Sequence, residues 1–265
     1  MPLGEVINVN SAQKAELERI VSDSMGITIS LAQLRRVVNG ANRLHFAILC
    51  ADGPIIALKA VTRGVASGEE KEEVIARLGI LLAAPNCCRL VLADSPRLIE
   101  DLRGIPHVAL SIWLHPSKRL GDLDGAEIEQ LRRSENLLRQ VGEWVAFGVG
   151  FGVADRHRLN WVIDLPAERL SMIDNEDAFG ATDPTIYREI VDFAVSDRNL
   201  LKTDKKSYAD GRPVILGLET MIQKILTNNN AVQAILIEKQ FSAGFRVPYT
   251  GMNPEQAADD IINRL

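Results

Sequence analysis

Apolar residues recur at two different periods along the chain, and the alternation between these periods sets the order of the predicted elements. In the first part, short apolar runs separated by turn residues predict strands at 34–38, 45–50 and 55–61. Asn39-Gly40 is a strong hairpin signal after the first run, and Asp52-Gly53-Pro54 follows the second. Such short connections leave no room for a crossover helix, so an antiparallel meander is expected.

Helical spacing appears on both sides of this meander. Residues 11–24 read as a helix with Ser11 at its N-cap, and residues 67–84 as a second helix with four glutamates near its start, where the helix dipole favours anions. Two further strands are predicted at 89–93 and 108–114. The later helical patterns begin at Ala126 and recur at 186–193, 216–227, 231–241 and 254–265.

The order of elements predicts an α+β fold with two lobes. A sheet, a helix and more strands come first, and a largely helical half follows. The soft boundary is 115–125, which contains Pro116, Gly121 and Gly125, and it divides the chain into an N-terminal lobe at 1–115 and a C-terminal lobe at 116–265. A cleft between two such lobes is the natural position for a ligand.

Composition and charge narrow the function classes. The chain has 265 residues, 46% of them hydrophobic and 25% charged, as in ordinary globular proteins. Its net charge of −5 argues against nucleic-acid binding through broad phosphate neutralisation. The sequence shows neither a secretory signal nor an apolar run long enough to span a membrane. Three cysteines without metal-ligand spacing are expected to be reduced thiols in a cytoplasmic protein.

Polar residues with phosphotransfer spacing lie in the second half. Asp155 is followed five positions later by Asn160, and Asp174 comes 14 residues after that. Between Asn160 and Asp174, two short apolar runs at 161–163 and 170–173 predict a hairpin. That hairpin would return Asp174 to the end at which Asn160 lies, where a divalent cation could bridge the two side chains.

The stretch Asp155-Arg156-His157-Arg158-Leu159-Asn160 resembles the catalytic loop Gly-Asp-Arg-His-x-x-Asn of phosphatidylinositol 3- and 4-kinase-like enzymes, with Ala154 in place of the glycine. The segment that begins Ile173-Asp174-Asn175-Glu176 resembles the Ile-Asp-x-Glu of aminoglycoside-phosphotransferase-like kinases. The chain is thus similar, over roughly residues 34–180, to the protein-kinase-like superfamily in the order of its motifs. This resemblance implies a two-lobed kinase fold that binds ATP and a divalent metal.

The resemblance assigns roles to the three polar residues. Asp155 would orient the acceptor hydroxyl or accept its proton, and Asn160 and Asp174 would ligate Mg²⁺ or Mn²⁺ through oxygen. His157 is interpreted as a residue that shapes the loop. Arg156 and Arg158 are equally compatible with stabilising phosphate charge and with pairing to local carboxylates.

A kinase also requires a lysine on its third strand and a carboxylate on the next helix. Lys59 lies on the third predicted strand, in the setting Ile56-Ala57-Leu58-Lys59. Glu70 is the first choice for its partner because it lies nearest the edge of the helix's apolar face, Glu73 is the second, and Glu72 stays open.

Two further stretches complete the predicted nucleotide site. The loop 38–43 would cradle the phosphates with its backbone N–H groups, through Gly40, while Arg43 would reach phosphate. It has one glycine where protein kinases have three, and an ordinary hairpin turn explains it equally well. Trp113 and Leu114 would connect the lobes, where kinases bind adenine through backbone groups.

The sequence therefore predicts a kinase that transfers the γ-phosphoryl group of ATP to a hydroxyl of a small molecule, a lipid headgroup or a dedicated protein target. The absence of D-F-G and A-P-E motifs after Asp174 argues against an ordinary protein kinase. Three alternatives remain open. They are a pseudokinase-like module that binds nucleotide, an enzyme of the same fold that transfers a nucleotidyl group, and a coincidental motif in an α+β scaffold protein.

Overall fold

The computed structural model describes most of the chain. The described residues are 3–37, 45–61, 68–85, 87, 90–112, 117–154, 156–173, 175, 177–180, 183–195, 211–238 and 247–265, without the side chains of residues 68 and 69.

Two compact units make up the chain. The N-terminal unit comprises Met1–Glu73 and Cys88–His115, and the C-terminal unit comprises Val74–Cys87 and Pro116–Leu265. Helix α2 (Gly68–Leu81) contributes its first residues to the N-terminal unit and the rest to the C-terminal unit.

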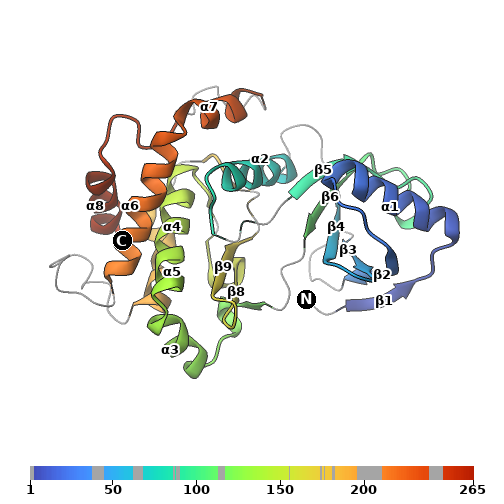
Figure 1. Cartoon of the computed structure of the whole chain (residues 1–265), viewed down its shortest axis with the longest axis horizontal. Coiled ribbons are helices and arrows are strands. Elements are labelled where there is room, and N and C mark those ends of the chain that lie inside the picture. Colours follow the sequence, from blue (N-terminus) through green and yellow to red (C-terminus); the bar gives the residue numbers. More distant parts are fainter. Residues whose placement is uncertain are drawn as a thin grey trace. The chain divides into compact units, whose positions relative to one another are not determined.

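A six-stranded antiparallel sheet forms the N-terminal unit and carries the strand order β1-β2-β3-β4-β6-β5 (Figure 1). Consecutive strands β2, β3 and β4 pair as neighbours, which confirms the predicted meander. Strand β6 pairs with β4 on one side and β5 on the other. The strands are β1 (Leu3–Ile7), β2 (Leu31–Val37), β3 (His45–Cys50), β4 (Ile55–Val61), β5 (Leu90–Asp94) and β6 (His107–Ile112).

Strand β1 was not expected from the sequence. It pairs with β2 at the edge of the sheet, and an irregularity interrupts its register between Leu3 and Val6. Its residues are half-buried or exposed, so they carry no clear alternation of apolar and polar positions. An edge strand of this kind is defined by its partner strand more than by its own pattern.

Helix α1 (Ser11–Met25) covers one face of this sheet (Figure 1). Leu17, Ile20, Val21 and Met25 of the helix join one apolar cluster with sheet residues such as Phe46. The N-cap is Asn10 and not Ser11 as predicted: its side chain accepts from the N–H groups of Ala12 and Gln13 in a capping box. The short 3-10 helix η1 (Glu100–Leu102) packs its Leu102 into the same cluster.

The C-terminal unit combines helices with a small sheet of strand order β7-β8-β9. Strands β8 and β9 confirm the predicted hairpin, and β7 adds a short strand to it. Its elements after α2 are β7 (Lys118–Arg119), η2 (Leu120–Asp122), α3 (Gly125–Arg133), α4 (Glu135–Gly150), η3 (Arg158–Asn160), β8 (Trp161–Asp164), β9 (Arg169–Met172), η4 (Pro184–Tyr187), α5 (Arg188–Ala194), α6 (Arg212–Thr227), α7 (Asn229–Glu238) and α8 (Pro254–Arg264).

The helical pattern that begins at Ala126 is two helices rather than one. Ser134 ends α3 and caps α4, because its hydroxyl accepts from the N–H of Leu137. Helix α4 is buried along most of its length and packs directly on α6, where a Cβ at Gly142 would collide with the carbonyl of Val214. The two helices therefore form the centre of the C-terminal core.

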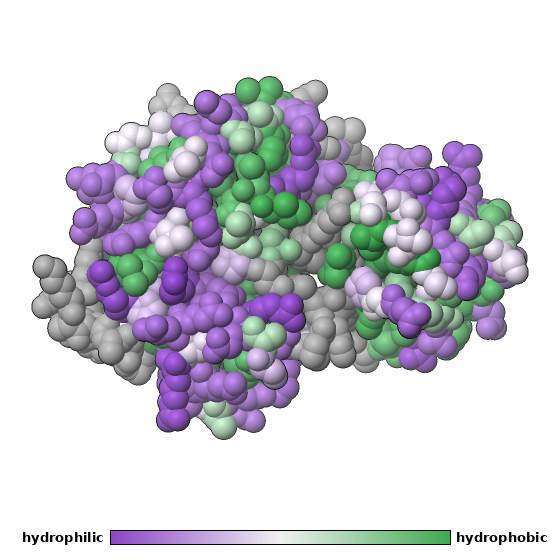
Figure 2. Space-filling view, viewed as in Figure 1, coloured by the Kyte–Doolittle hydropathy of each residue, from purple (hydrophilic) through white to green (hydrophobic). Residues whose placement is uncertain are grey.

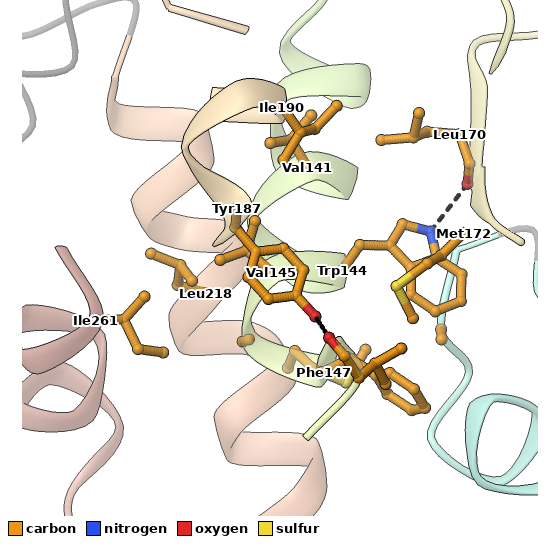
Figure 3. Packing of buried hydrophobic residues seen from close by; sticks show 14 of the residues in the cluster. Val141, Trp144, Val145, Phe147, Leu170, Met172, Tyr187, Ile190, Leu218 and Ile261 are labelled. Atoms are coloured by element: carbon orange, nitrogen blue, oxygen red, sulfur yellow. Dashed lines mark hydrogen bonds between the residues drawn. The ribbon is translucent and has the colours of Figure 1, made fainter. Parts of the chain in front are cut away.

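Large side chains fill this core between the helices and the hairpin (Figure 3). Trp144 of α4 donates its indole N–H to the carbonyl of Leu170 in β9, at 3.0 Å, and so ties the helix to the small sheet. Tyr187 packs near α4 and α6, and its hydroxyl donates to the carbonyl of Val153 at 2.8 Å. These contacts place the hairpin and the loop that precedes it on a rigid base.

The surface drawn in Figure 2 is mixed, with apolar patches surrounded by hydrophilic residues. Large apolar side chains on the described surface include Ile80, Leu98 and Ile237, each at least half exposed. Within the described ranges, no helix combines the length and the apolar character that crossing a bilayer requires.

Candidate active site

Lys59 and Glu72 form an ion pair in the N-terminal unit. Lys59 lies on β4, the third strand of the meander, and its Nζ is 3.5 Å from Oε2 of Glu72 on α2. The two side chains are only 18% and 10% exposed. Lysine and glutamate are rarely buried to this extent unless they are paired, so the contact fixes both side chains.

The pairing selects Glu72 where the sequence favoured Glu70, with Glu73 as the second choice. The reason is the direction in which the first turns of α2 face. Glu72 shares its helical face with Ile75 and Ala76, three and four residues further on, and all three are buried. The prediction used Val74 and Leu78 to define the apolar face, but the buried surface of α2 is wider than that stripe.

The asparagine of the candidate loop lies at the start of the hairpin in the C-terminal unit. Asn160 ends η3 and is 6% exposed. Trp161 pairs with Met172, and the N–H of Ile173 donates to the carbonyl of Asn160 at 3.0 Å. The hairpin thus brings Asn160 opposite Ile173, the residue directly before Asp174 in sequence.

Several predicted site residues lie outside the described part of the structure. They are Gly40 and Arg43 of the phosphate loop, Trp113 and Leu114 of the connection, Asp155 and Asp174. Their roles remain predictions. Among the residues that are described, no group of three or more His, Cys, Asp or Glu side chains is arranged to hold a metal ion.

Arg156 holds the segments on both sides of the hairpin together. Its guanidinium is buried, with the residue 2% exposed. Nε donates to the carbonyl of Ala154 at 2.9 Å, and Nη1 donates to the carbonyl of Ile173 at 2.9 Å and to Oδ1 of Asn175 at 3.3 Å. These acceptors directly precede Asp155 and flank Asp174 in sequence, so Arg156 is placed to organise the loop from within.

Backbone hydrogen bonds add to this hold. The N–H of Ala154 donates to the carbonyl of Asp177, and Phe179 and Gly180 donate to the carbonyls of Phe151 and Gly152. Gly152 has φ of +62°, and a Cβ there would collide with the carbonyl of Gly180. The loop therefore needs glycine at this position.

The remaining two basic residues of the motif have local roles. His157 is the N-cap of η3, and its Nδ1 accepts from the N–H of Leu159 at 3.2 Å. Arg158 is exposed, and its Nε lies 3.7 Å from Oε1 of Glu189. The backbone N–H of Arg158 donates to Oε2 of the same glutamate. The structure thus supports a loop-shaping role for His157 and pairing with a local carboxylate for Arg158.

Tyr187 supports the loop through the hydrogen bond that its hydroxyl donates to the carbonyl of Val153. Burial raises the pKa of its hydroxyl far above the usual value, because the phenolate would be desolvated there. The tyrosine therefore remains a neutral hydrogen-bond donor throughout the physiological pH range.

Oxygen ligands at this loop suit Mg²⁺ or Mn²⁺. The buried Asn160 offers an amide oxygen, and Asp155 and Asp174 would add carboxylate oxygens, the donor set that hard cations prefer. No nitrogen or sulfur ligand is required. The chemistry of these residues therefore fits the predicted metal.

Comparisons with known proteins give likeness at the level of structure. No family model matches the sequence, and no curated protein matches it. The open conformation of CtTel1 has a TM-score of 0.53 and 11% identity over 100% of this chain and 13% of CtTel1. The FAT and kinase domain of CtTel1 has a TM-score of 0.48 and 12% identity over 88% of this chain and 22% of that one.

The third structure is the Helicobacter pylori proinflammatory kinase CtkA. It has a TM-score of 0.47 and 10% identity, over 85% of this chain and 88% of CtkA. This chain thus spans most of the length of CtkA and about an eighth of CtTel1. The alignment with the open conformation of CtTel1 extends over the whole of this chain, and at 11% identity it shows likeness of fold. The chain has a protein-kinase-like fold, as the order of motifs in its sequence predicts.

Proposed function

We propose that this protein is an ATP-dependent and metal-dependent phosphotransferase that moves the γ-phosphoryl group to a hydroxyl of a small molecule, a lipid headgroup or a dedicated protein target. The Lys59–Glu72 pair carries the proposal. A lysine on the third strand of an antiparallel meander, held by a carboxylate of the next helix, is the arrangement that kinases use to position the α- and β-phosphates.

The catalytic loop would supply the second part of the chemistry. Asp155 would orient the acceptor hydroxyl and take its proton as a bond forms between that oxygen and the γ-phosphorus. The bond from the γ-phosphorus to the bridging oxygen breaks, and ADP leaves. Asn160 and Asp174 would hold Mg²⁺ or Mn²⁺, which supplies charge neutralisation at the phosphates when bound.

Positioning is the main task of the protein in such a reaction. The buried Lys59–Glu72 contact and the anchored loop around Asn160 support this proposal, because both restrict functional side chains to one geometry. Arg156 would contribute through the loop rather than by touching phosphate, since its guanidinium donates to the loop's own carbonyls.

Nucleotide-dependent thermal stabilisation tests the proposal. The melting temperature is measured with ATP, with and without Mg²⁺ or Mn²⁺, for the wild type, Lys59→Met and Asp174→Ala. A ligand that binds only the native state raises stability by mass action. We expect a metal-dependent rise that both variants lose. Lys14→Met, on the exposed surface of α1, is the matched lysine control and should retain the rise.

An acceptor screen with labelled ATP then separates the alternatives. Release of ADP with transfer of the γ-phosphate supports the phosphotransferase. Release of pyrophosphate identifies a nucleotidyl transferase, and binding without consumption identifies a nucleotide-binding module. An unchanged melting temperature at millimolar nucleotide and metal would overturn the proposal.

A further inference from the structure

The two faces of the N-terminal sheet differ in chemistry. One face packs on α1 through apolar residues of the meander, among them Leu34, Phe46 and Leu58. Directly opposed residues of an antiparallel pair project from the same face, and so do residues two apart on one strand. Applied to the observed register, this rule assigns a different set of side chains to the other face.

That second face carries Lys59 together with a row of polar and small residues. Lys59 is opposite His45 on β3 and Ala109 on β6. Two residues before Lys59, Ala57 is opposite Ala47, and Ala47 is opposite Arg35 on β2. Arg35 therefore shares the face of Lys59, with Ala47 on the strand between them and Ala57 on the lysine's own strand.

Arg35 is half-buried, and its environment leaves a donor unsatisfied. Its Nε is shielded from solvent without a hydrogen-bond partner, and among the described residues no carboxylate forms an ion pair with it. Buried donors of a guanidinium normally have acceptors, and no described residue supplies one to the Nε of Arg35.

Its neighbour Arg36 provides an internal comparison. Arg36 lies on the opposite face of β2, where Nη2 donates to Oδ2 of Asp101 at 2.8 Å. Its Nε also lacks a hydrogen-bond partner, but it lies 3.7 Å from Oε1 of Glu5 in an ion pair. The hydrogen bond and charge of Asp101 raise the pKa of Arg36. One arginine of the pair is thus engaged within the protein, and the other is directed to the face of Lys59.

The distance between Arg35 and Lys59 suits a ligand with several phosphates. They lie two strands apart and two residues apart along the strands, which places their Cα atoms about 12 Å apart from strand spacing and rise. Both side chains are long, and the residues that separate them on this face include the alanines at 47 and 57 and His45. A guanidinium binds phosphate through two parallel N–H groups, which a lysine cannot do.

We infer that Arg35 is a second phosphate-binding residue on this face, and that the phosphate groups of the nucleotide supply the acceptor for its guanidinium. The inference rests on the proposed function, because it takes the ligand to be the nucleotide that Lys59 binds. It adds a residue that neither the motif order nor the predicted phosphate loop identifies.

The test compares Arg35→Met with Arg36→Met by titration calorimetry with Mg-ATP and with inorganic tripolyphosphate. Arg35→Met removes a charge-assisted hydrogen bond to phosphate, so we expect it to lose roughly 10- to 100-fold in affinity for both ligands. Arg36→Met, which removes the same charge from the other face, should bind both ligands as the wild type does. Arg35→Lys keeps the charge without the fork and should recover part of the affinity.

The melting temperature of each variant without ligand shows whether it folds. Wild-type affinity for both ligands in a folded Arg35→Met overturns the assignment of Arg35 while the proposed function stands. Equal losses in Arg35→Met and Arg36→Met also overturn it, because they indicate a general effect of charge. A wild type that binds neither ligand overturns the proposed function and the assignment with it.

Discussion

Lys59 in the N-terminal unit and Asn160 in the C-terminal unit are held by different kinds of contact. Lys59 pairs with a side chain of the next helix, and its Nζ lies 3.5 Å from Oε2 of Glu72. Asn160 belongs to a loop that is held by backbone hydrogen bonds, by the buried guanidinium of Arg156 and by the hydroxyl of Tyr187. A contact between side chains can be lost with little change in fold, whereas the loop cannot lose its supports without a loss of stability.

The strongest test of this difference uses two glycines with positive φ. Gly152→Ala should lower the free energy of unfolding by roughly 2–5 kcal/mol, because the methyl group adds a collision with the carbonyl of Gly180 to the cost of a left-handed residue. Gly104→Ala, at φ of +83° in open space, should lose only about 1 kcal/mol. Urea unfolding measures both, and equal losses would show that the loop is not tightly packed.

Arg156→Met should lower the free energy of unfolding by roughly 2–4 kcal/mol, since it leaves buried acceptors of the loop without their donor. Arg158→Met removes the same charge two residues further along the chain, where the arginine forms an exposed ion pair. It should lower the free energy of unfolding by no more than about 0.5 kcal/mol. Chemical denaturation of the two variants measures both losses in unfolding free energy. Similar values would mean that Arg156 acts by charge alone.

Glu72→Gln should change stability less and function more. We expect a loss of about 1–2 kcal/mol in unfolding free energy, because a largely buried lysine loses its charged partner, and a fall of ten-fold or more in phosphotransfer. A double-mutant cycle with Lys59→Met isolates the coupling between the two side chains. Glu70→Gln is the comparison that the sequence favoured, and a larger effect there would reject Glu72 as the functional partner.

The smallest expected effect is that of alkaline pH on the support of the loop. Burial raises the pKa of Tyr187, so its contribution to stability is complete below the unfolded-state pKa of about 10 and declines as the pH rises above it. Unfolding free energy should fall by about 1 kcal/mol between pH 10 and 11 for this tyrosine. Tyr187→Phe should have a shallower slope over that interval, and an unchanged slope would contradict the assignment.

Much of the fold follows from local sequence. The turn residues between 50 and 55 and the apolar runs on either side of them predict the pairing of β3 with β4, which the register confirms. The hairpin of β8 and β9 was likewise predicted, because each strand carries its own apolar run. The edge strand β1 and the break at Ser134 were missed, since each depends on a neighbouring element that its local pattern does not reveal.

Local patterns in the sequence predict the kinase-like order of motifs and the positions of Lys59 and Asn160, because turn chemistry and apolar period fix which residues end a strand or begin a hairpin. Three outcomes come from long-range packing: Glu72 pairs with Lys59, Arg156 binds loop carbonyls, and Arg35 shares a face with Lys59 while Arg36 does not. These outcomes depend on the rotation of a helix, the burial of a guanidinium and the register of three strands. Such quantities are set by packing among residues distant in sequence.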